Sequence, residues 1–224
     1  YEKTELTLFR EVLRPGMTVV DIGANLGLYT VIAARQVGPT GRVFAYEPEP
    51  FNFALLKKNI EINHLTNVTA INAGLADKPG QLELYLDDHN RGSHSFAKNN
   101  PAQNRLVVKT DTLDHSLEAF DAPQIDILKM DIEGAEALAM EGMVKTITRS
   151  PGLKIFTEFY PEAIEKVSGS STQFLTNLSK AQFSLQVIKH DGNLIIKDTE
   201  AFARNFPRKN KFVNLYAEKI KTVN

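Results

Sequence analysis

The chain has 224 residues, a formal net charge of −1 and no cysteine. Its 42% hydrophobic and 24% charged residues are typical of a globular α/β domain with a substantial core. The lack of cysteine excludes disulfides, thiolate metal sites and a cysteine nucleophile, which suits a cytoplasmic protein. The balanced charge argues against a dedicated nucleic-acid surface, and no apolar run approaches the ~20 residues that cross a bilayer.

The first elements predict half of a nucleotide-binding unit. Residues 1–16 are expected to form a helix, and residues 18–22 a short buried strand rich in β-branched side chains. The chain then turns through Gly23 and Gly27 into an apolar helix over about 26–37. The glycines let a ligand approach the backbone, and the free N–H groups at the helix start point toward it.

The turn departs from the dinucleotide fingerprint G-x-G-x-x-G in two ways. Asn25 stands in place of the second glycine, and Asp21 leads the turn directly from the strand. A carboxylate repels a phosphate but suits an ammonium or a sulfonium. The pattern therefore favours a cationic ligand over NAD, with a turn whose glycines serve packing alone as the simpler alternative.

The second strand, 42–46, ends at Glu47, which comes 26 positions after Asp21. An acid near this point binds the ribose hydroxyls in dinucleotide folds. Two charge-assisted hydrogen bonds of ~1.5–3 kcal/mol each would favour a carboxylate there. We therefore expect Glu47 to bind a ribose, the alternative being a solvated acid at a strand end.

A helix is expected from about residue 50 to residue 63, because Pro50 suits a first helical position. Phe51, Leu55 and Ile62 are expected to face the sheet.

A third strand, 67–71, follows this helix. The next residues, Asn72 and Ala73, are expected to border an adenine, because they stand just past the strand end. Residues 81–86 alternate as a further strand.

Residues 87–104 are polar and without periodicity. A loop of this length in a compact domain is usually functional or disordered. We interpret it as part of a substrate-facing lid, and a plain surface loop remains the alternative. The residues expected nearest the site are Arg91, Gly92, Ser93 and His94.

A second group of acids follows the strand 125–130. Asp131 ends this strand, and Glu133 and Glu136 are expected in the start of a helix that runs toward Gly142. Acids at a helix start gain ~0.3–1 kcal/mol from its dipole, but that gain does not explain Asp131. Open α/β sheets bind ligands at the carboxyl ends of their strands, where Asp131 should meet the earlier acids.

The remaining chain predicts a strand over 152–157 with Glu158 at its end, helices from about 161 and over 172–181, and closing strands at 183–188 and 212–218. A basic segment contains Arg204, Arg208, Lys209 and Lys211, which are expected on a solvated surface. No linker or repeat is evident, so residues 1–224 are expected to be one domain. Its cofactor half would be about 1–80 and its substrate side about 87–104 and 158–212.

Taken together, these motifs resemble the FkbM family of S-adenosylmethionine-dependent methyltransferases. They are Val20–Gly27, Glu47-Pro48, Asn72–Asp77 with Gly80, Thr112–Asp114 and, most distinctive, Ile127–Glu136. The resemblance covers roughly residues 10–160 and ends after Glu158. It implies a three-layer Rossmann-like fold with a mostly parallel central sheet and helices on both faces. It also implies methyl transfer from S-adenosylmethionine to a hydroxyl of a small molecule, often a sugar or a polyketide-type metabolite.

Asp131 is the first candidate for the general base, which would speed attack by a hydroxyl ~10²–10⁴-fold. Glu133 and Glu136 would repel its charge and raise its affinity for a proton. Glu158 and His94 are the alternative bases. Lys129, within the strand, is expected to pair with an acid.

Three other interpretations stay open. An Asp131–Glu133–Glu158 metal site would suit a hard cation, but no second group of ligands supports it. An NAD-dependent oxidoreductase is disfavoured by Asn25 and the leading Asp21. A methyltransferase-like binding module without activity is disfavoured because the acids at the strand ends are intact.

Overall fold

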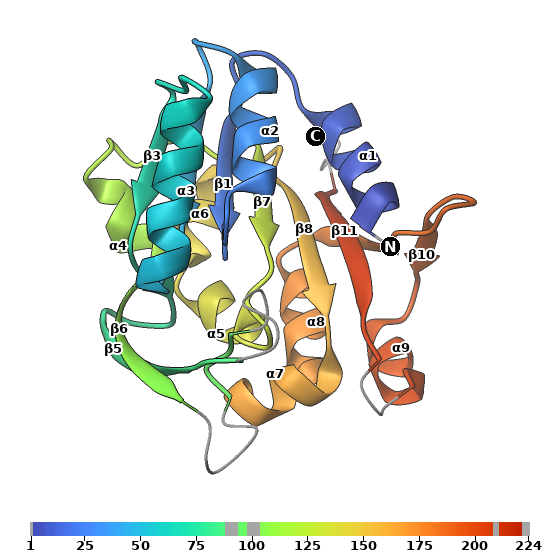
Figure 1. Ribbon diagram of the computed structural model, residues 1–224. Helices are drawn as coiled ribbons and strands as arrows, with labels where there is room; N and C mark the ends of the chain where they lie inside the picture. The colour runs from blue at the N-terminus through green and yellow to red at the C-terminus, as the bar shows by residue number, and fades with distance from the viewer. Residues whose placement is uncertain (1, 88–93, 98–103, 208–210, 221–224) are drawn as a thin grey trace.

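The computed structural model describes residues 2–87, 94–97, 104–207 and 211–220 (Figure 1). The helices are α1 (Glu2–Val12), α2 (Leu28–Val37), α3 (Pro50–Ile62), α4 (Leu113–Glu118), α5 (Glu136–Glu141), α6 (Val144–Arg149), α7 (Pro161–Ser168), α8 (Ser171–Lys180) and α9 (Thr199–Asn205). The strands are β1 (Thr18–Ile22), β2 (Arg42–Tyr46), β3 (Val68–Ile71), β4 (Gly74–Leu75), β5 (Gly80–Tyr85), β6 (Arg105–Asp111), β7 (Ile127–Met130), β8 (Lys154–Phe159), β9 (Phe183–Val187), β10 (Leu194–Ile196) and β11 (Val213–Lys219). No helix among these residues is long and apolar enough to cross a membrane.

The main sheet has eight strands in the order β10-β9-β11-β8-β7-β1-β2-β3. The five strands from β8 to β3 run parallel, and β11 lies antiparallel between β8 and β9. From β1 the chain continues through β2 to β3 on one side, and it later returns to form β7 on the other side of β1. A ligand crevice is expected where the order reverses in this way, outside the carboxyl ends of the strands.

Helices cover both faces of the sheet, because successive side chains along its strands pack alternately into two apolar cores, one on each face (Figure 1). On β1, Val19 joins the cluster that contains Phe9 of α1 and Ala33 of α2, whereas Val20 joins the cluster that contains Leu117 of α4 and Phe174 of α8. A second, three-stranded sheet, β4-β6-β5, lies beside the carboxyl ends of the main strands. The expected three-layer α/β fold is confirmed.

Three local predictions were wrong. The first helix ends at Val12 instead of residue 16. The second begins only at Leu28, because the turn occupies the residues before it. The helix expected directly after Met130 begins at Glu136, because Glu133 and Gly134 adopt positive φ angles of 51° and 103° that interrupt it.

The buried face of α3 was also misjudged. Phe51 and Ile62 are 51% and 61% exposed, whereas Asn52 and Leu56 are buried. The predicted face is displaced by one residue, because apolar side chains surround this helix and its pattern does not fix which stripe meets the sheet. Asn52 is thereby turned toward the carboxyl ends of the strands.

Candidate active site

The turn after β1 brings the backbone close to that of β7. Gly23 has a φ of 78°, and a Cβ there would lie 2.1 Å from the backbone oxygen of Asp131. Gly27, with a φ of 94°, caps α2, and Asn25 adopts a φ of 50° between them. Only a residue without a side chain fits at Gly23, so the glycine is required by the approach of two parallel strands as well as by the turn.

Asp21 lies behind the turn and does not line the cavity described below. Its side chain is buried, and its Oδ2 accepts a hydrogen bond of 2.5 Å from the Thr30 hydroxyl of α2. Burial raises the pKa of Asp21 to about 6, a rise that the Thr30 hydrogen bond and Lys129 reduce. Asp21 therefore links β1 to α2 and places negative charge beneath the turn.

Glu47 is tied into the same turn by both of its oxygens. Oε2 accepts from the backbone N–H of Asn25 at 2.8 Å, and Oε1 accepts from that of Glu49 at 2.9 Å. Burial raises the pKa of Glu47 to about 7, against the opposing effect of these two N–H groups. Each carboxylate oxygen can accept a second hydrogen bond, so Glu47 can hold the turn and still receive a ligand hydroxyl.

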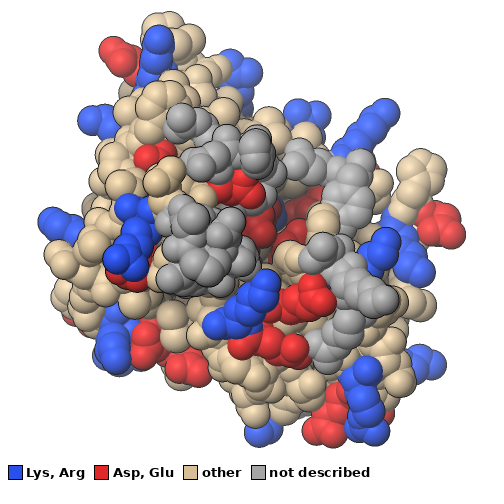
Figure 2. All heavy atoms as spheres, turned by 60° about the horizontal axis from the view of Figure 1, so that its bottom comes forward, with Lys and Arg blue, Asp and Glu red and all other residues tan. Residues whose placement is uncertain are grey.

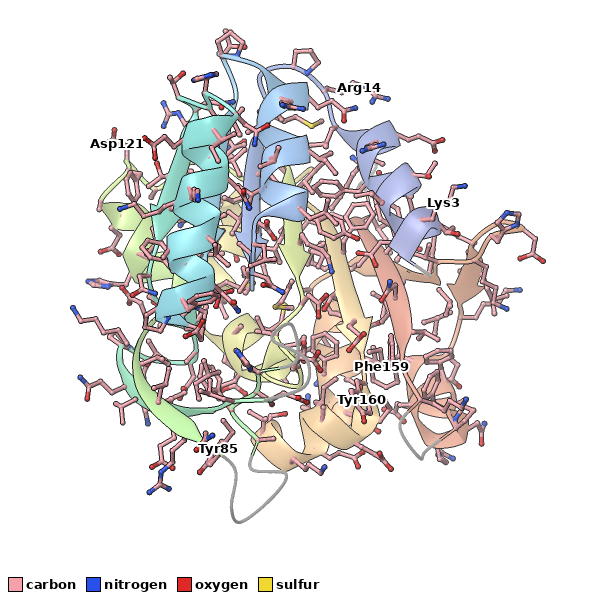
Figure 3. All side chains as sticks on the ribbon, in the orientation of Figure 1. Lys3, Arg14, Tyr85, Asp121, Phe159 and Tyr160 are labelled. Atoms are coloured by element: carbon pink, nitrogen blue, oxygen red, sulfur yellow. The ribbon has the colours of Figure 1, made fainter. Side chains whose placement is uncertain are left out.

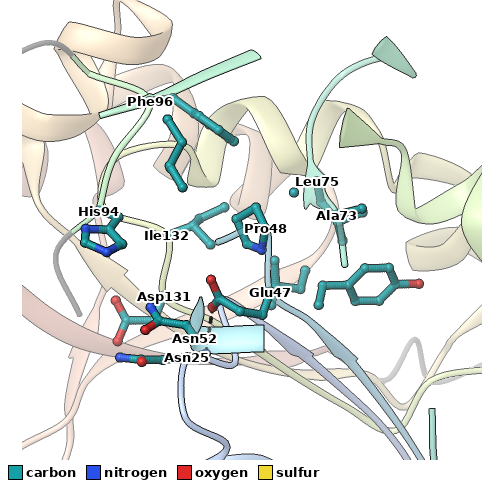
Figure 4. Close-up of a pocket in the computed structure, with 15 residues that line it drawn as sticks. Asn25, Glu47, Pro48, Asn52, Ala73, Leu75, His94, Phe96, Asp131 and Ile132 are labelled. Carbon is teal, nitrogen blue, oxygen red and sulfur yellow. Dashed lines mark hydrogen bonds between the residues drawn. The ribbon is translucent and has the colours of Figure 1, made fainter. Parts of the chain in front are cut away.

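A cavity opens at the carboxyl ends of β1, β2 and β7. It is lined by Ile22, Gly23, Asn25, Tyr46, Glu47, Pro48, Asn52, Ala73, Gly74, Leu75, Leu84, His94, Phe96, Asp131 and Ile132. Figure 4 shows Asn25, Glu47 and Asp131 along one side and Ala73, Leu75 and Phe96 across from them. Among the described residues, the buried Asn25 Oδ1 has no hydrogen-bond partner, so it is available to a bound molecule.

Asn72 and Ala73, the two residues expected to border an adenine, make different contacts. Ala73 lines the cavity, whereas the amide of Asn72 donates to the backbone oxygens of Glu47 and Pro48 at 2.8 and 3.1 Å. Asn72 is therefore placed as a brace for the chain around Glu47. Gly27 also lies outside the cavity and shapes it through the start of α2.

From the predicted lid, His94 and Phe96 reach the cavity, whereas Ser95 and Ala97 line a second hollow beside it. The Nδ1 atom of His94 accepts from the backbone N–H of Asp87 at 3.0 Å, so that nitrogen is already engaged. Arg91, Gly92 and Ser93, also expected near the site, lie outside the described residues.

The acids after β7 and on β8 belong to the carboxyl end of the sheet, the end that comes forward in Figure 2, where Asp and Glu side chains are gathered. Glu158 lies within β8, one residue before its end, and not beyond the strand as predicted. Burial and the charges of Asp131, Glu133 and Glu136 raise the pKa of Glu158 to about 9. Burial likewise raises the pKa of Glu136 to about 8. Both carboxyls are therefore protonated at neutral pH.

Of the three predicted bases, Asp131 and His94 line the cavity, and Glu158 does not. Lys129 pairs with acids, as expected, at 3.2 Å from Glu5 Oε1 and 3.4 Å from Asp131 Oδ2. Within the described part of the chain, no three His, Asp or Glu side chains are grouped so as to hold a metal ion. The arrangement places two carboxyl groups, Glu47 and Asp131, on the cavity, with the buried Glu136 and Glu158 outside its lining.

Sequence reasoning missed several residues of the cavity. Tyr46 could have been predicted to line the cavity, because it ends the strand that precedes Glu47. No sequence pattern indicated Asn52 or Phe96, since the position of Asn52 depends on the rotation of α3 and that of Phe96 on the path of a loop. Glu5 lies outside the cavity lining, and its pairing with Lys129, 124 positions away, likewise has no sequence pattern that predicts it.

The chain has curated relatives among methyltransferases. Methyltransferase 1 of Beauveria bassiana is 28% identical over 144 residues, which are 56% of this chain and 57% of that protein. The hexuronic acid methyltransferase AglP of Haloferax volcanii is 24% identical over 147 residues, which are 65% of this chain and 58% of that protein. The chain thus spans somewhat more than half the length of these relatives.

Solved structures share the fold. The methyltransferase FkbM of Methylobacillus flagellatus is 16% identical with a TM-score of 0.56, over 94% of this chain and 50% of that chain. SMU.1697c of Streptococcus mutans, in complex with SAH, is 10% identical with a TM-score of 0.57, over 97% of each chain. These similarities support the Rossmann-like methyltransferase fold. The Methyltransferase FkbM domain matches residues 21–185, which include the glycine turn and the acids after β7, and the chain therefore belongs to the FkbM methyltransferase family.

Proposed function

We propose that residues 1–224 form one domain that binds S-adenosylmethionine and methylates a hydroxyl oxygen of a small molecule, such as a sugar or a polyketide-type metabolite. The observation that carries the proposal is the gathering of Asn25, Glu47 and Asp131 around one cavity at the carboxyl end of a parallel sheet. Family membership supports methyl transfer over NAD chemistry. The relative AglP, named for a hexuronic acid, supports a sugar-like acceptor.

The cavity suits the parts of this cofactor. Glu47 can accept from the ribose hydroxyls, and the unpartnered Oδ1 of Asn25 can accept from an ammonium group. Ala73, Leu75 and Phe96 offer an apolar surface for a purine ring. Asp21, buried beneath the turn, adds a negative potential that suits a cation.

When bound, S-adenosylmethionine supplies a methyl group on a positively charged sulfur. Asp131 would orient the acceptor hydroxyl in line with that methyl group and take its proton as the new C–O bond forms and the C–S bond breaks. The electron pair of the broken bond remains on sulfur, which becomes a neutral thioether. Alignment of this kind can lower the barrier by ~7 kcal/mol or more, and the base adds ~10²–10⁴-fold.

The alternative bases fit less well. Glu158 is protonated at neutral pH, because its pKa is raised to about 9 by burial and neighbouring acids. His94 uses Nδ1 to accept from the backbone N–H of Asp87, so in the neutral imidazole Nε2 carries the proton and cannot remove another. Both are better suited to donate a hydrogen bond than to remove a proton.

Titration calorimetry with S-adenosylhomocysteine, with NAD as the control, tests the cofactor. Micromolar binding of the first and none of the second is the expected result. Labelled S-adenosylmethionine with a panel of hexoses, hexuronic acids and polyketide alcohols then tests the acceptor. Binding of NAD in place of S-adenosylhomocysteine would overturn the proposal.

A further inference from the structure

Lys129 is a fully enclosed cation at the end of the central strand β7. Its side chain is 4% exposed, and three groups surround the ammonium. Glu5 Oε1 of α1 lies 3.2 Å from Nζ, Asp131 Oδ2 lies 3.4 Å away, and the Tyr29 ring of α2 has its centre at 5.0 Å. One buried ammonium therefore connects the first helix of the chain to the carboxylate that lines the cavity.

Packing of the core does not require the ion pair between Lys129 and Glu5. Two residues earlier on the same strand face, Ile127 packs with Phe9 and Phe156 in an apolar cluster. Burying two charges there carries a desolvation penalty, and apolar side chains of similar size are often as stable or more so. The pair is thus better explained by what it does to Asp131 than by its contribution to the core.

Glu5 is itself held in place from the far side of α1. It is 2% exposed, and the Asn214 side chain of β11 donates a hydrogen bond to its Oε2. Figure 3 shows Lys3, in the first turn of α1, nearer the carboxyl ends of the strands than Arg14, which follows the end of this helix. The first turns of α1 therefore reach the level of the site, where Glu5 restrains the lysine.

We propose that Glu5 and Lys129 are a positioning pair: the buried ammonium holds Asp131 ionised and directed at the cavity rim, and Glu5 fixes that ammonium from α1. The inference rests on the proposed function, in which Asp131 is the base. Lys129 acts through Asp131 and lines no part of the cavity. The side chain of Asp131 is 47% exposed, so it remains accessible to an acceptor while one oxygen contacts the lysine.

Acidic side chains from four elements lie around Asp131 and Lys129. They are Glu5 on α1, Asp21 on β1, Glu133 and Glu136 before and on α5, and Glu158 on β8. Glu47 and His94 line the same cavity, and Tyr29 covers the lysine. Lys129 contacts Asp131 itself, whereas Lys166 of α7 lines a neighbouring hollow with Glu133. Removal of Lys129 is therefore expected to act first on Asp131.

The test is a carbon-detected NMR titration of the Asp131 carboxyl in the full chain, assigned by comparison with Asp131→Asn. In Glu5→Gln/Lys129→Met both charges are gone, while the glutamine can still accept from Asn214. The midpoint of the Asp131 titration should rise by about 1 pH unit or more, because an opposite charge at this distance favours the ionised form by that amount. In Glu5→Gln alone the lysine retains Asp131 as its partner, so the midpoint should fall or stay unchanged.

Lys154→Met/Glu218→Gln is the matched control, because it removes another lysine–glutamate pair, at 3.3 Å between β8 and β11. It should leave the Asp131 midpoint unchanged. Equal midpoints in the wild type and Glu5→Gln/Lys129→Met, or shifts of the same sign in both Glu5 variants, would overturn the inference. Calorimetry with S-adenosylhomocysteine on the same samples separates this outcome from failure of the proposed function, since the cofactor can bind whether or not Asp131 responds.

Discussion

The two sides of the cavity hold their carboxylates in different ways. On the β1–β2 side, Asp21 and Glu47 receive hydrogen bonds from Thr30, Asn25 and Glu49, all close in sequence or in the same turn. That side is organised by local backbone geometry.

The β7–β8 side depends on groups brought from distant parts of the chain. Glu136 receives one backbone hydrogen bond, from Ile132, and its Oε2 has no hydrogen-bond partner among the described residues. Its pKa and that of Glu158 are raised by burial and by neighbouring acids, and Asp131 depends on Lys129 for a cation. In the proposed function, the β1–β2 side would bind the cofactor and the β7–β8 side would face the acceptor, where shifted pKa values are typical of groups that transfer protons.

The largest effect is expected from Asp131→Asn, which removes the base and keeps the shape. Turnover with an acceptor from the screen should fall ~10²–10⁴-fold, while affinity for S-adenosylhomocysteine stays within about twofold. Initial rates and calorimetry measure the two quantities, and Asp77→Asn, at an exposed position, is the control. Near-normal turnover would exclude Asp131 as the base.

Gly23→Ala tests the junction between the two sides, because a Cβ there would lie 2.1 Å from the backbone oxygen of Asp131. Gly38→Ala is the control: its φ of 68° also lies in the region that favours glycine, but no atom lies within 4 Å of the added carbon. We expect Gly23→Ala to lower the free energy of unfolding by about 2–3 kcal/mol more than Gly38→Ala, and to abolish cofactor binding. Urea unfolding and calorimetry measure both, and equal losses would show that Gly23 serves the turn alone.

Much of the β1–β2 side could be predicted from sequence, because its signals are local. The glycines of the turn, Asp21 before them and Glu47 at the next strand end have fixed spacings that follow from one βαβ unit. Glu47 in the cavity was foreseen for this reason. The burial of Asp21 behind the turn was not, because the direction of its side chain depends on Thr30.

The β7–β8 side was harder to predict. The pairing of Lys129 with Glu5 joins the chain's first helix to its central strand, and no local pattern encodes that contact. The helix α9 was not predicted, and Phe51 was expected to face the sheet but is exposed, because weak amphipathic patterns do not reveal which face meets the core. Sequence thus identified the acids, and the tertiary structure decided which of them reach the cavity.

A smaller effect is expected from Glu47→Ala. The change removes the acceptor for a ribose and two hydrogen bonds within the turn, so affinity for S-adenosylhomocysteine should fall by tens of fold, about 2 kcal/mol. Calorimetry measures it, and Glu61→Ala, on the exposed face of α3, should bind normally. Unchanged affinity in Glu47→Ala would remove this residue from the cofactor site.

The last prediction concerns stability as a function of pH. The pKa of Glu136 rises from 4.5 to about 8 on folding because of its burial, so the native state binds more protons than the unfolded chain between these values. Its stabilising contribution is complete below the unfolded pKa and is lost as the pH rises through the folded one. The free energy of unfolding should therefore fall between pH 5 and 8, with at most ~1.4 kcal/mol per pH unit from this group.

Glu136→Gln should make that decline shallower, because a neutral side chain then occupies the site at every pH. Glu158 and Glu47 titrate with the same sign and will leave a residual slope. Glu141→Gln, on the same helix but exposed, should keep the full slope. Urea midpoints at pH 5, 6, 7 and 8 measure the difference. Parallel curves of urea midpoint against pH for wild type and Glu136→Gln would mean that Glu136 is ionised in the native state. The β7–β8 side of the cavity would then have one protonated acid fewer, and the difference between the two sides would be smaller.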